Sequence, residues 1–192
     1  MEFKAQAYSD QTFSKVFCLG QDLQHKEFSN CKFVKCDFSG CNFSGTTFVD
    51  CEFVDCNLSN IKVDKCSFQK VTFANCKIVG AVFSNINTLL IEWSFARCLI
   101  ELCNFSYLEL RRSKFVACTI RESDFIKTNL MESDFSNSDL QGSKFNDANL
   151  EKADFSGAVN YFIDPTQSKI KGAKFSYPEA MSLLDSFEIV ID

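Results

Sequence analysis

Apolar side chains recur at every fifth residue of this chain. Steps of five from Phe3 reach an apolar residue each time as far as Phe83, and a second series runs from Phe95 to Phe155. The two series are two residues out of phase, and the change of phase falls in SNINTLLIEWS, residues 84–94. Together they contain 18 of the 22 phenylalanines. In the second series Phe alternates with Leu or Ile, which adds a period of ten.

A period of five fits neither the two-residue period of a strand nor the 3.6-residue period of a helix. A backbone that places every fifth side chain in one environment must bend once per five residues. The chain has only 7 Gly and 2 Pro, too few turn residues for a succession of ordinary hairpins. The pattern therefore predicts a solenoid of stacked coils. It divides the chain into a first run (1–83), a phase break (84–94), a second run (95–177) and a tail (178–192).

The cysteines follow the same period. We call each fifth apolar residue a lattice residue. Ten of the 11 cysteines lie two places before one, in both phases, and the other occupants of that position are mostly Ser, Ala and Thr. A free cysteine behaves as a small hydrophobic residue, so this position is predicted to point inward and be filled by packing.

Two alternatives for the cysteines, a metal site and a disulfide framework, are disfavoured. The C-x₄-C spacing follows from the period, and the chain has a single histidine, His25, which falls at an otherwise polar position. Stacked rungs lie ~4.8 Å apart, whereas the Cβ atoms of a disulfide lie ~3.8 Å apart. We expect no metal and no cofactor.

The sequence lacks the features of a membrane span, a signal peptide and a histidine-based catalytic site. No run approaches the ~18–20 apolar residues of a membrane span, and MEFKAQAYSD does not resemble a signal peptide. Eleven cysteines without a signal peptide predict a reducing, cytoplasmic location. One histidine gives no basis for a catalytic triad or a Cys–His pair. We expect no enzyme and no membrane association.

The units CKFVK, CDFSG, CNFSG, SDFSN, SDLQG, ANLEK and ADFSG resemble pentapeptide repeats over roughly residues 3–175. The resemblance implies an all-β fold, a right-handed quadrilateral β-helix with four pentapeptides per coil and about eight or nine turns. Lattice residues and the residues two places before them would point inward. In the second run, Phe would then stack on two opposite faces, and Leu or Ile on the other two. Phe3 would lie at the open N-terminal end.

The tail refines the resemblance. SYPEAMSLLDSF begins with a proline suited to a first helical turn and carries apolar residues at helical spacing. This layout is similar to the quinolone-resistance pentapeptide proteins, of the Qnr and mycobacterial types, but without their long loops. The resemblance implies a C-terminal helix and strand that form a two-fold homodimer interface through Ala180, Leu183, Leu184, Phe187 and Ile189.

Negative charge is concentrated in the second half. Residues 1–83 are neutral, and the whole net charge of −5 comes from residues 84–192. This balance disfavours direct nucleic-acid binding and is compatible with a basic partner. The acidic residues predicted to bind that partner are Glu122, Asp124, Glu132, Asp134, Asp139, Asp147, Glu151 and Asp154.

Two functions remain open at this stage. A rod of duplex width with acids along it resembles the charge of DNA, and the family resemblance implies binding to a type II topoisomerase, DNA gyrase or topoisomerase IV, with an effect on quinolone action. The alternative is an interaction scaffold with another protein partner. An effect on gyrase supercoiling distinguishes the two.

Two further features stand outside the repeats. Trp93, the only tryptophan, lies in the phase break and is expected to fill the core at a bend rather than to serve as a ligand platform. Arg111 and Arg112 form the only basic pair. We expect a solvated corner there, with an anchor for an acidic partner as the alternative.

Overall fold

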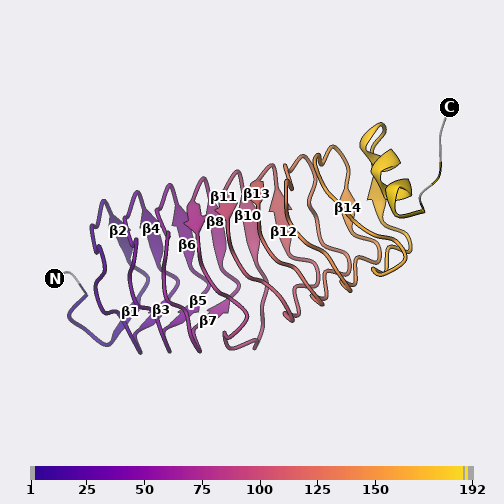
Figure 1. Ribbon diagram of the computed structural model, residues 1–192. Coiled ribbons are helices and arrows are strands. Elements are labelled where there is room, and N and C mark those ends of the chain that lie inside the picture. Colours follow the sequence, from indigo (N-terminus) through magenta and orange to yellow (C-terminus); the bar gives the residue numbers. More distant parts are fainter. Residues whose placement is uncertain (1–2, 188, 190–192) are drawn as a thin grey trace.

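The computed structural model describes residues 3–187 and 189. The chain winds as a parallel β-solenoid of about eight turns, and a short helix lies at its C-terminal end (Figure 1). The predicted all-β coil is confirmed, while its right-handed sense stays a prediction. No helix among the described residues has the length and apolar character needed to cross a bilayer.

Each coil has four faces, which we number in chain order. Face 1 carries β1 (Ala7–Ser9), β3 (Glu27–Ser29), β5 (Thr47–Val49) and β7 (Ser67–Gln69). Face 2 carries β2 (Thr12–Ser14), β4 (Lys32–Val34), β6 (Glu52–Val54), β8 (Thr72–Ala74), β10 (Ser94–Ala96), β12 (Lys114–Val116), β14 (Asp154–Phe155) and β15 (Lys174–Phe175). Face 3 carries β9 (Lys77–Val79), β11 (Leu99–Glu101) and β13 (Thr119–Arg121). Face 4 is held by isolated bridges such as Asp124 to Lys144.

The coils stack in register, all strand pairs being parallel. Phe28 pairs with Phe48, and Phe33 with Phe53, so each residue meets the residue 20 places later. A corner lies two residues after each lattice residue. Of the 24 non-glycine residues with positive φ, all but Leu90 and Asn160 are at such corners. Between residues 8 and 155 the regular corners all show this left-handed geometry except at Asn85, beside the phase break. The predicted bend once per five residues is therefore a left-handed residue at each corner.

Phenylalanine rings form continuous stacks inside the coil. On face 2 nine rings stack one above another, with centroids 4.7–5.3 Å apart in each neighbouring pair, at Phe13, Phe33, Phe53, Phe73, Phe95, Phe115, Phe135, Phe155 and Phe175. In the second run, Phe105 and Phe125 stack on the opposite face 4 at 4.9 Å. Phe115 meets Phe125 edge-on across the axis at 5.6 Å. The predicted Phe columns on two opposite faces are confirmed, and Ile100 over Ile120 begins the aliphatic column of face 3.

The phase break is a coil of 22 residues instead of 20. Ser67 bridges to Asn87, 20 places on, but Phe73 pairs with Phe95, 22 places on, so the extra residues lie between faces 1 and 2. Thr88, where a core residue of face 1 would fall, is exposed. Trp93 fills this space: its side chain is 2% exposed and its indole Nε1 donates to the carbonyl of Phe68 at 2.9 Å. The expected packing role of Trp93 is confirmed.

A second irregularity lies near the C-terminal end. Lys144 bridges to Phe162, only 18 places on, and Asn149 to Lys169 returns the stack to steps of 20. The next two steps of five after Phe155 reach Asn160 and Pro165, which are not apolar core residues, and Tyr161 and Ile163 are buried in their place. The core therefore continues to the end of the solenoid by a local shift of two residues.

One expectation about the N-terminal end is wrong. Phe3 does not lie open to solvent but is 1% exposed. Its ring lies 5.0 Å from Phe13 and 5.5 Å from Phe28, so it closes the end of the core. The partly buried ring at this end is Phe13.

Candidate protein-binding surface

The acidic residues predicted as a binding surface lie on all four sides of the rod. Their places follow from the coil register and the side-chain contacts. Glu151 lies on face 1, Asp134 and Asp154 on face 2, Asp139 on face 3 and Asp124 on face 4, while Glu122, Glu132 and Asp147 occupy corners. Only Asp134 and Asp154 are direct neighbours in one column, as the 20-residue repeat predicts. The structure therefore distributes these carboxylates around the second half and does not gather them on one face.

Four of the eight carboxylates are paired with a cation about one coil away. Asp124 meets Lys144 at 3.5 Å and Asp154 meets Lys174 at 3.1 Å. Glu132 lies between Arg112, at 2.7 Å, and Lys152, at 3.8 Å. Lysines one coil away therefore interrupt the acidic columns at Asp124, Glu132 and Asp154. Ion pairs between exposed side chains stabilise a fold little, so these pairs act mainly by reducing the local negative field.

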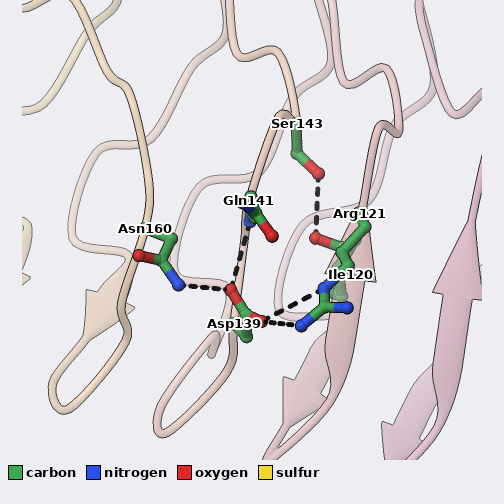
Figure 2. Close-up of polar contacts among 6 residues, drawn as sticks. All are labelled: Ile120, Arg121, Asp139, Gln141, Ser143 and Asn160. Carbon is green, nitrogen blue, oxygen red and sulfur yellow. Dashed lines mark hydrogen bonds and ion pairs between the residues drawn. The ribbon is translucent and has the colours of Figure 1, made fainter.

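Asp139 has the most extensive contacts of the acidic residues (Figure 2). Its carboxylate accepts hydrogen bonds from Arg121 Nη2 at 2.7 Å and from Asn160 Nδ2 at 2.8 Å. Partial burial raises the pKa of the Asp139 carboxyl, but these hydrogen bonds outweigh it and hold the pKa below its ordinary value. Asp139 therefore adds stability above about pH 4, the unfolded pKa, and loses that contribution as acid protonates it.

The other four carboxylates form no ion pair within the described part of the chain: Glu122, Asp134, Asp147 and Glu151. The Glu122 carboxylate lies against the next coil at Gly142, where an added Cβ would come within 2.4 Å of it. Gly142 has a φ of +72°, so both its conformation and its close neighbour favour glycine. These four side chains are therefore among the unpaired carboxylates of the second half.

The cysteines give this surface no reactive group. All 11 are buried, and none forms a disulfide. Several thiols donate a hydrogen bond to a backbone carbonyl of the preceding coil, as Cys51 Sγ does to the carbonyl of Phe28 at 3.4 Å. Thr128 Oγ1 donates to the carbonyl of Phe105 in the same way at 2.9 Å. Burial raises the pKa of the Cys51 thiol to about 12 and that of Cys103 to about 11, so both stay protonated at neutral pH.

The packing interpretation of the cysteines is confirmed, with the addition that some thiols bond to the backbone. Among the residues that the structure describes, no group of three or more His, Cys, Asp or Glu side chains is placed to hold a metal ion.

The tail forms a 3₁₀-helix, η1 (Glu179–Phe187), which begins one residue after Pro178. Leu183 packs against the core of the same chain. Ala180 and Leu184 are partly buried, whereas Phe187 and Ile189 are 51% and 55% exposed. The helix expected from the sequence is present, but as a 3₁₀-helix. Most of the strand expected after it falls at residues 188 and 190–192, outside the described residues.

Sequence reasoning missed several residues that shape this surface. Arg121 and Asn160 bind Asp139 from 18 and 21 residues away, and the i±20 spacing of a regular coil is the signal that brings such pairs close. Arg111 and Arg112 are exposed, as expected, but Arg112 is not simply solvated, because it binds Glu132. The exposed Leu102 and Tyr107 carry no pattern that marks them in advance.

Comparison with known proteins identifies the family of the five-residue repeat. The family model of the pentapeptide repeat region matches residues 26–92 and 90–159. No curated protein matches the chain.

Among solved structures, a trypsin-treated variant of QnrB1, a plasmid-mediated fluoroquinolone resistance protein, is 22% identical with a TM-score of 0.55 and covers 98% of this chain and 99% of that one. A second such variant is 20% identical with a TM-score of 0.51 and covers 95% and 100%. HetL, a pentapeptide repeat protein involved in heterocyst differentiation regulation from the cyanobacterium Nostoc, is 16% identical with a TM-score of 0.48 and covers 88% and 87%.

At these identities the structural likeness establishes the fold, and the match of the family model over most of the sequence establishes the family. The chain belongs to the pentapeptide-repeat family.

Proposed function

We propose that this protein is a non-catalytic binding rod whose acidic second half engages a type II topoisomerase in the manner of a DNA duplex. The observation that carries the proposal is the set of unpaired carboxylates in that half, among them Glu122, Asp134, Asp147 and Glu151, on a coil of stacked rungs. A duplex carries one charge per ~1.7 Å of axis, and charge distributed around a rod resembles it more closely than one acidic face would. The solved structures with a similar fold include a fluoroquinolone resistance protein.

The test is the effect of the purified full-length chain on supercoiling by DNA gyrase, with and without a fluoroquinolone. We expect the chain to alter supercoiling and the double variant Asp134→Lys/Asp154→Lys to need about tenfold more protein for the same effect. Each charge reversal at an exposed contact costs about 0.5–1 kcal/mol, and 1.4 kcal/mol is a factor of ten. These two residues share one column of face 2, so the variant alters a defined stripe.

The chain offers a matched control in its neutral half. Glu27 and Glu52 are exposed strand residues that directly precede a core phenylalanine, as Asp134 and Asp154 do. Glu27→Lys/Glu52→Lys makes the same change of net charge and is expected to retain the full effect. Supercoiling that stays unchanged at micromolar protein, with and without the drug, rules out the topoisomerase proposal.

A scaffold for another protein partner is the second candidate. The observation that favours it is the pairing of Asp124, Glu132, Asp139 and Asp154 with cations, which removes half of the predicted acidic set from a continuous field. On this candidate the rod leaves gyrase unaffected, and the two double-lysine variants behave alike in the supercoiling assay.

We also propose that the C-terminal segment forms a homodimer interface. Phe187 and Ile189 are more than half exposed at the end of the rod, and Met181 is 38% exposed beside them in η1. Leu183 and Ala180 serve instead to seat the helix on its own coil, because Leu183 contacts the core. A two-fold contact here would double the acidic charge of one continuous rod.

Sedimentation equilibrium of the full-length chain tests the dimer. We expect Phe187→Asp to weaken self-association by at least about thirtyfold, because loss of a central aromatic contact costs about 2 kcal/mol or more. The control is Phe162→Asp, an equally exposed phenylalanine on face 4 (61% exposed), which should leave the dimer intact. A wild-type chain that is monomeric at about 100 μM, where a standard-size interface would be occupied, contradicts the proposal.

A further inference from the structure

The phase break opens a hollow at the corner between faces 1 and 2. Its volume is about 650 Å³, and its walls come from three successive coils. Lys70 and Thr72 lie on the first coil, Glu92 and Ser94 on the second, and the third contributes Arg111, Arg112 and Lys114. The hollow exists because the two extra residues of the 22-residue coil interrupt the backbone bridges of face 1. Ser67 bridges to Asn87, and Glu109 bridges to Asn129, but no described bridge joins Asn87 to Glu109.

The lining of this hollow is positively charged although the whole chain carries a net charge of −5. Four lining residues are cationic, and Glu92 is the only acidic one. Of the four cations only Arg112 forms an ion pair in the described part of the chain, at 2.7 Å from Glu132. Arg111 Nη2 contacts Met131 Sδ at 3.2 Å, which holds the guanidinium beside an uncharged group. Three cations therefore line one hollow without forming an ion pair to a described carboxylate, and Glu92 is the single acidic residue beside them.

One backbone amide at this corner also lacks a hydrogen-bond acceptor. In the coil before, the amide of Asp50 donates to the carbonyl of Gln69 at 2.9 Å, and in the coil after, the amide of Arg112 donates to that of Met131 at 3.0 Å. The equivalent amide of Lys70 makes no such bond among the hydrogen bonds of the described residues. The bond from Ser94 to Val71 is long, at 3.3 Å. An unpaired amide donor thus lies on a residue that lines the hollow.

We propose that this basic hollow binds a small phosphorylated molecule that carries two or three linked phosphoryl groups. Pockets for small molecules have volumes of about 300–1,000 Å³, which includes this one. Guanidinium groups bind phosphate oxygens through paired N–H donors, and lysine supplies a compact positive charge. Three rungs ~4.8 Å apart span about 10 Å. A hollow of this length fits a short polyphosphate chain, whereas a long polymer would have to extend beyond the walls of the hollow at both ends. Thr72 and Ser94 add hydroxyl donors.

Calorimetric titration of the full-length chain with sodium tripolyphosphate tests this proposal, with ATP as a second ligand. We expect one site per chain and a dissociation constant at least about tenfold weaker in Arg111→Gln/Lys114→Gln, because the variant loses charged hydrogen bonds to the phosphate oxygens. Equal affinity for both ligands assigns recognition to the phosphates, and tighter binding of ATP assigns it to a nucleotide. Circular dichroism confirms that the variant keeps its fold.

The matched control is Lys65→Gln/Lys127→Gln. Both residues are exposed corner lysines, and neither makes an ion pair with a described residue, so the change of net charge is the same at sites away from the hollow. We expect this control to bind tripolyphosphate as the wild type does. Three results overturn the proposal: no binding at millimolar tripolyphosphate, equal weakening in both variants, or tighter binding of oligoglutamate, which would assign the hollow to an acidic protein segment.

Discussion

Phe125→Ala is expected to lower the free energy of unfolding by about 3–5 kcal/mol, the usual cost of replacing a buried phenylalanine by alanine. The Phe125 side chain is 0% exposed. Its ring stacks on Phe105 at 4.9 Å and Phe145 at 5.1 Å, and it meets Phe115 edge-on at 5.6 Å. Removing it therefore breaks a column and a contact across the axis in the same step.

The cavity left by this substitution has little means of closing. The amide of Phe125 donates to the carbonyl of Lys144 at 2.8 Å, and the amide of Phe105 donates to that of Asp124 at 2.8 Å, so the rungs are fixed above and below. A core that cannot relax keeps the full cavity volume, and this places the cost toward the upper part of the range. The rigidity of the coil is thus the reason for the size of the effect.

Urea denaturation followed by circular dichroism measures this loss. Phe162→Ala removes the same side chain from the surface of face 4, where it is 61% exposed, and is expected to cost less than about 0.5 kcal/mol. Phe125→Leu keeps most of the volume and should fall between the two. Similar losses for Phe125→Ala and Phe162→Ala would contradict a core built from stacked rings.

The features of the fold that repeat could be predicted from the sequence. The period of five identifies the inward positions, and once four steps make a coil the register of 20 places Phe115 over Phe95 and Asp154 over Asp134. Each coil meets only its neighbours, so a local pattern determines the long-range contacts. The same reasoning predicted that Cys and Ser share an inward position, because both are small.

The features that do not repeat could be predicted only in part. The period locates the phase break at residues 84–94, but it gives no such signal near the C-terminal end, where Tyr161 and Ile163 are buried in place of the lattice residues. The pattern also gives no rotamers for outward side chains, and the contacts of Asp139 with Arg121 and Asn160 depend on them. The burial of Phe3 depends on how the end of the rod closes, where no further coil supplies the pattern.

The candidate surface, too, could be predicted only in part. The excess of acidic residues was visible in the sequence. Their distribution over four faces became clear only from the structure, which places Glu122, Glu132 and Asp147 at corners of the coil. The basic hollow arises from the break in the repeat, and its cations come from residues 70 to 114, which are far apart in the sequence. The period therefore located this break and its tryptophan, whereas the hollow and the cations around it required the structure.

Trp93→Ala, the second large effect, is expected to destabilise the protein by about 3–5 kcal/mol. The indole lies two places before Phe95, where the neighbouring coils carry Val71 and Ser113. It contacts the rings of Phe68 at 5.8 Å and Phe83 at 5.4 Å. The substitution removes this large side chain and also leaves the carbonyl of Phe68 without the Nε1 donor at 2.9 Å.

The location of Trp93 predicts a change in the course of unfolding as well. In a solenoid, stability is the sum of the coils and the interfaces between neighbours. Face 1 lacks a described bridge between Asn87 and Glu109, so on this face the two runs meet through the indole instead of a backbone ladder. We expect the variant to unfold in two steps, with the halves before and after the break losing structure at different urea concentrations.

Hydrogen exchange of the backbone amides, followed through the urea transition, separates the two halves. Trp93→Phe is the matched variant, because it keeps an aromatic ring in the core but lacks the indole donor. It should retain a single transition and cost about 1–3 kcal/mol, the range for a buried acceptor left unpaired. A single transition in Trp93→Ala with a loss below about 1 kcal/mol would show that the two runs are held together by the ladders of faces 2, 3 and 4 alone, through pairs such as Phe73 with Phe95.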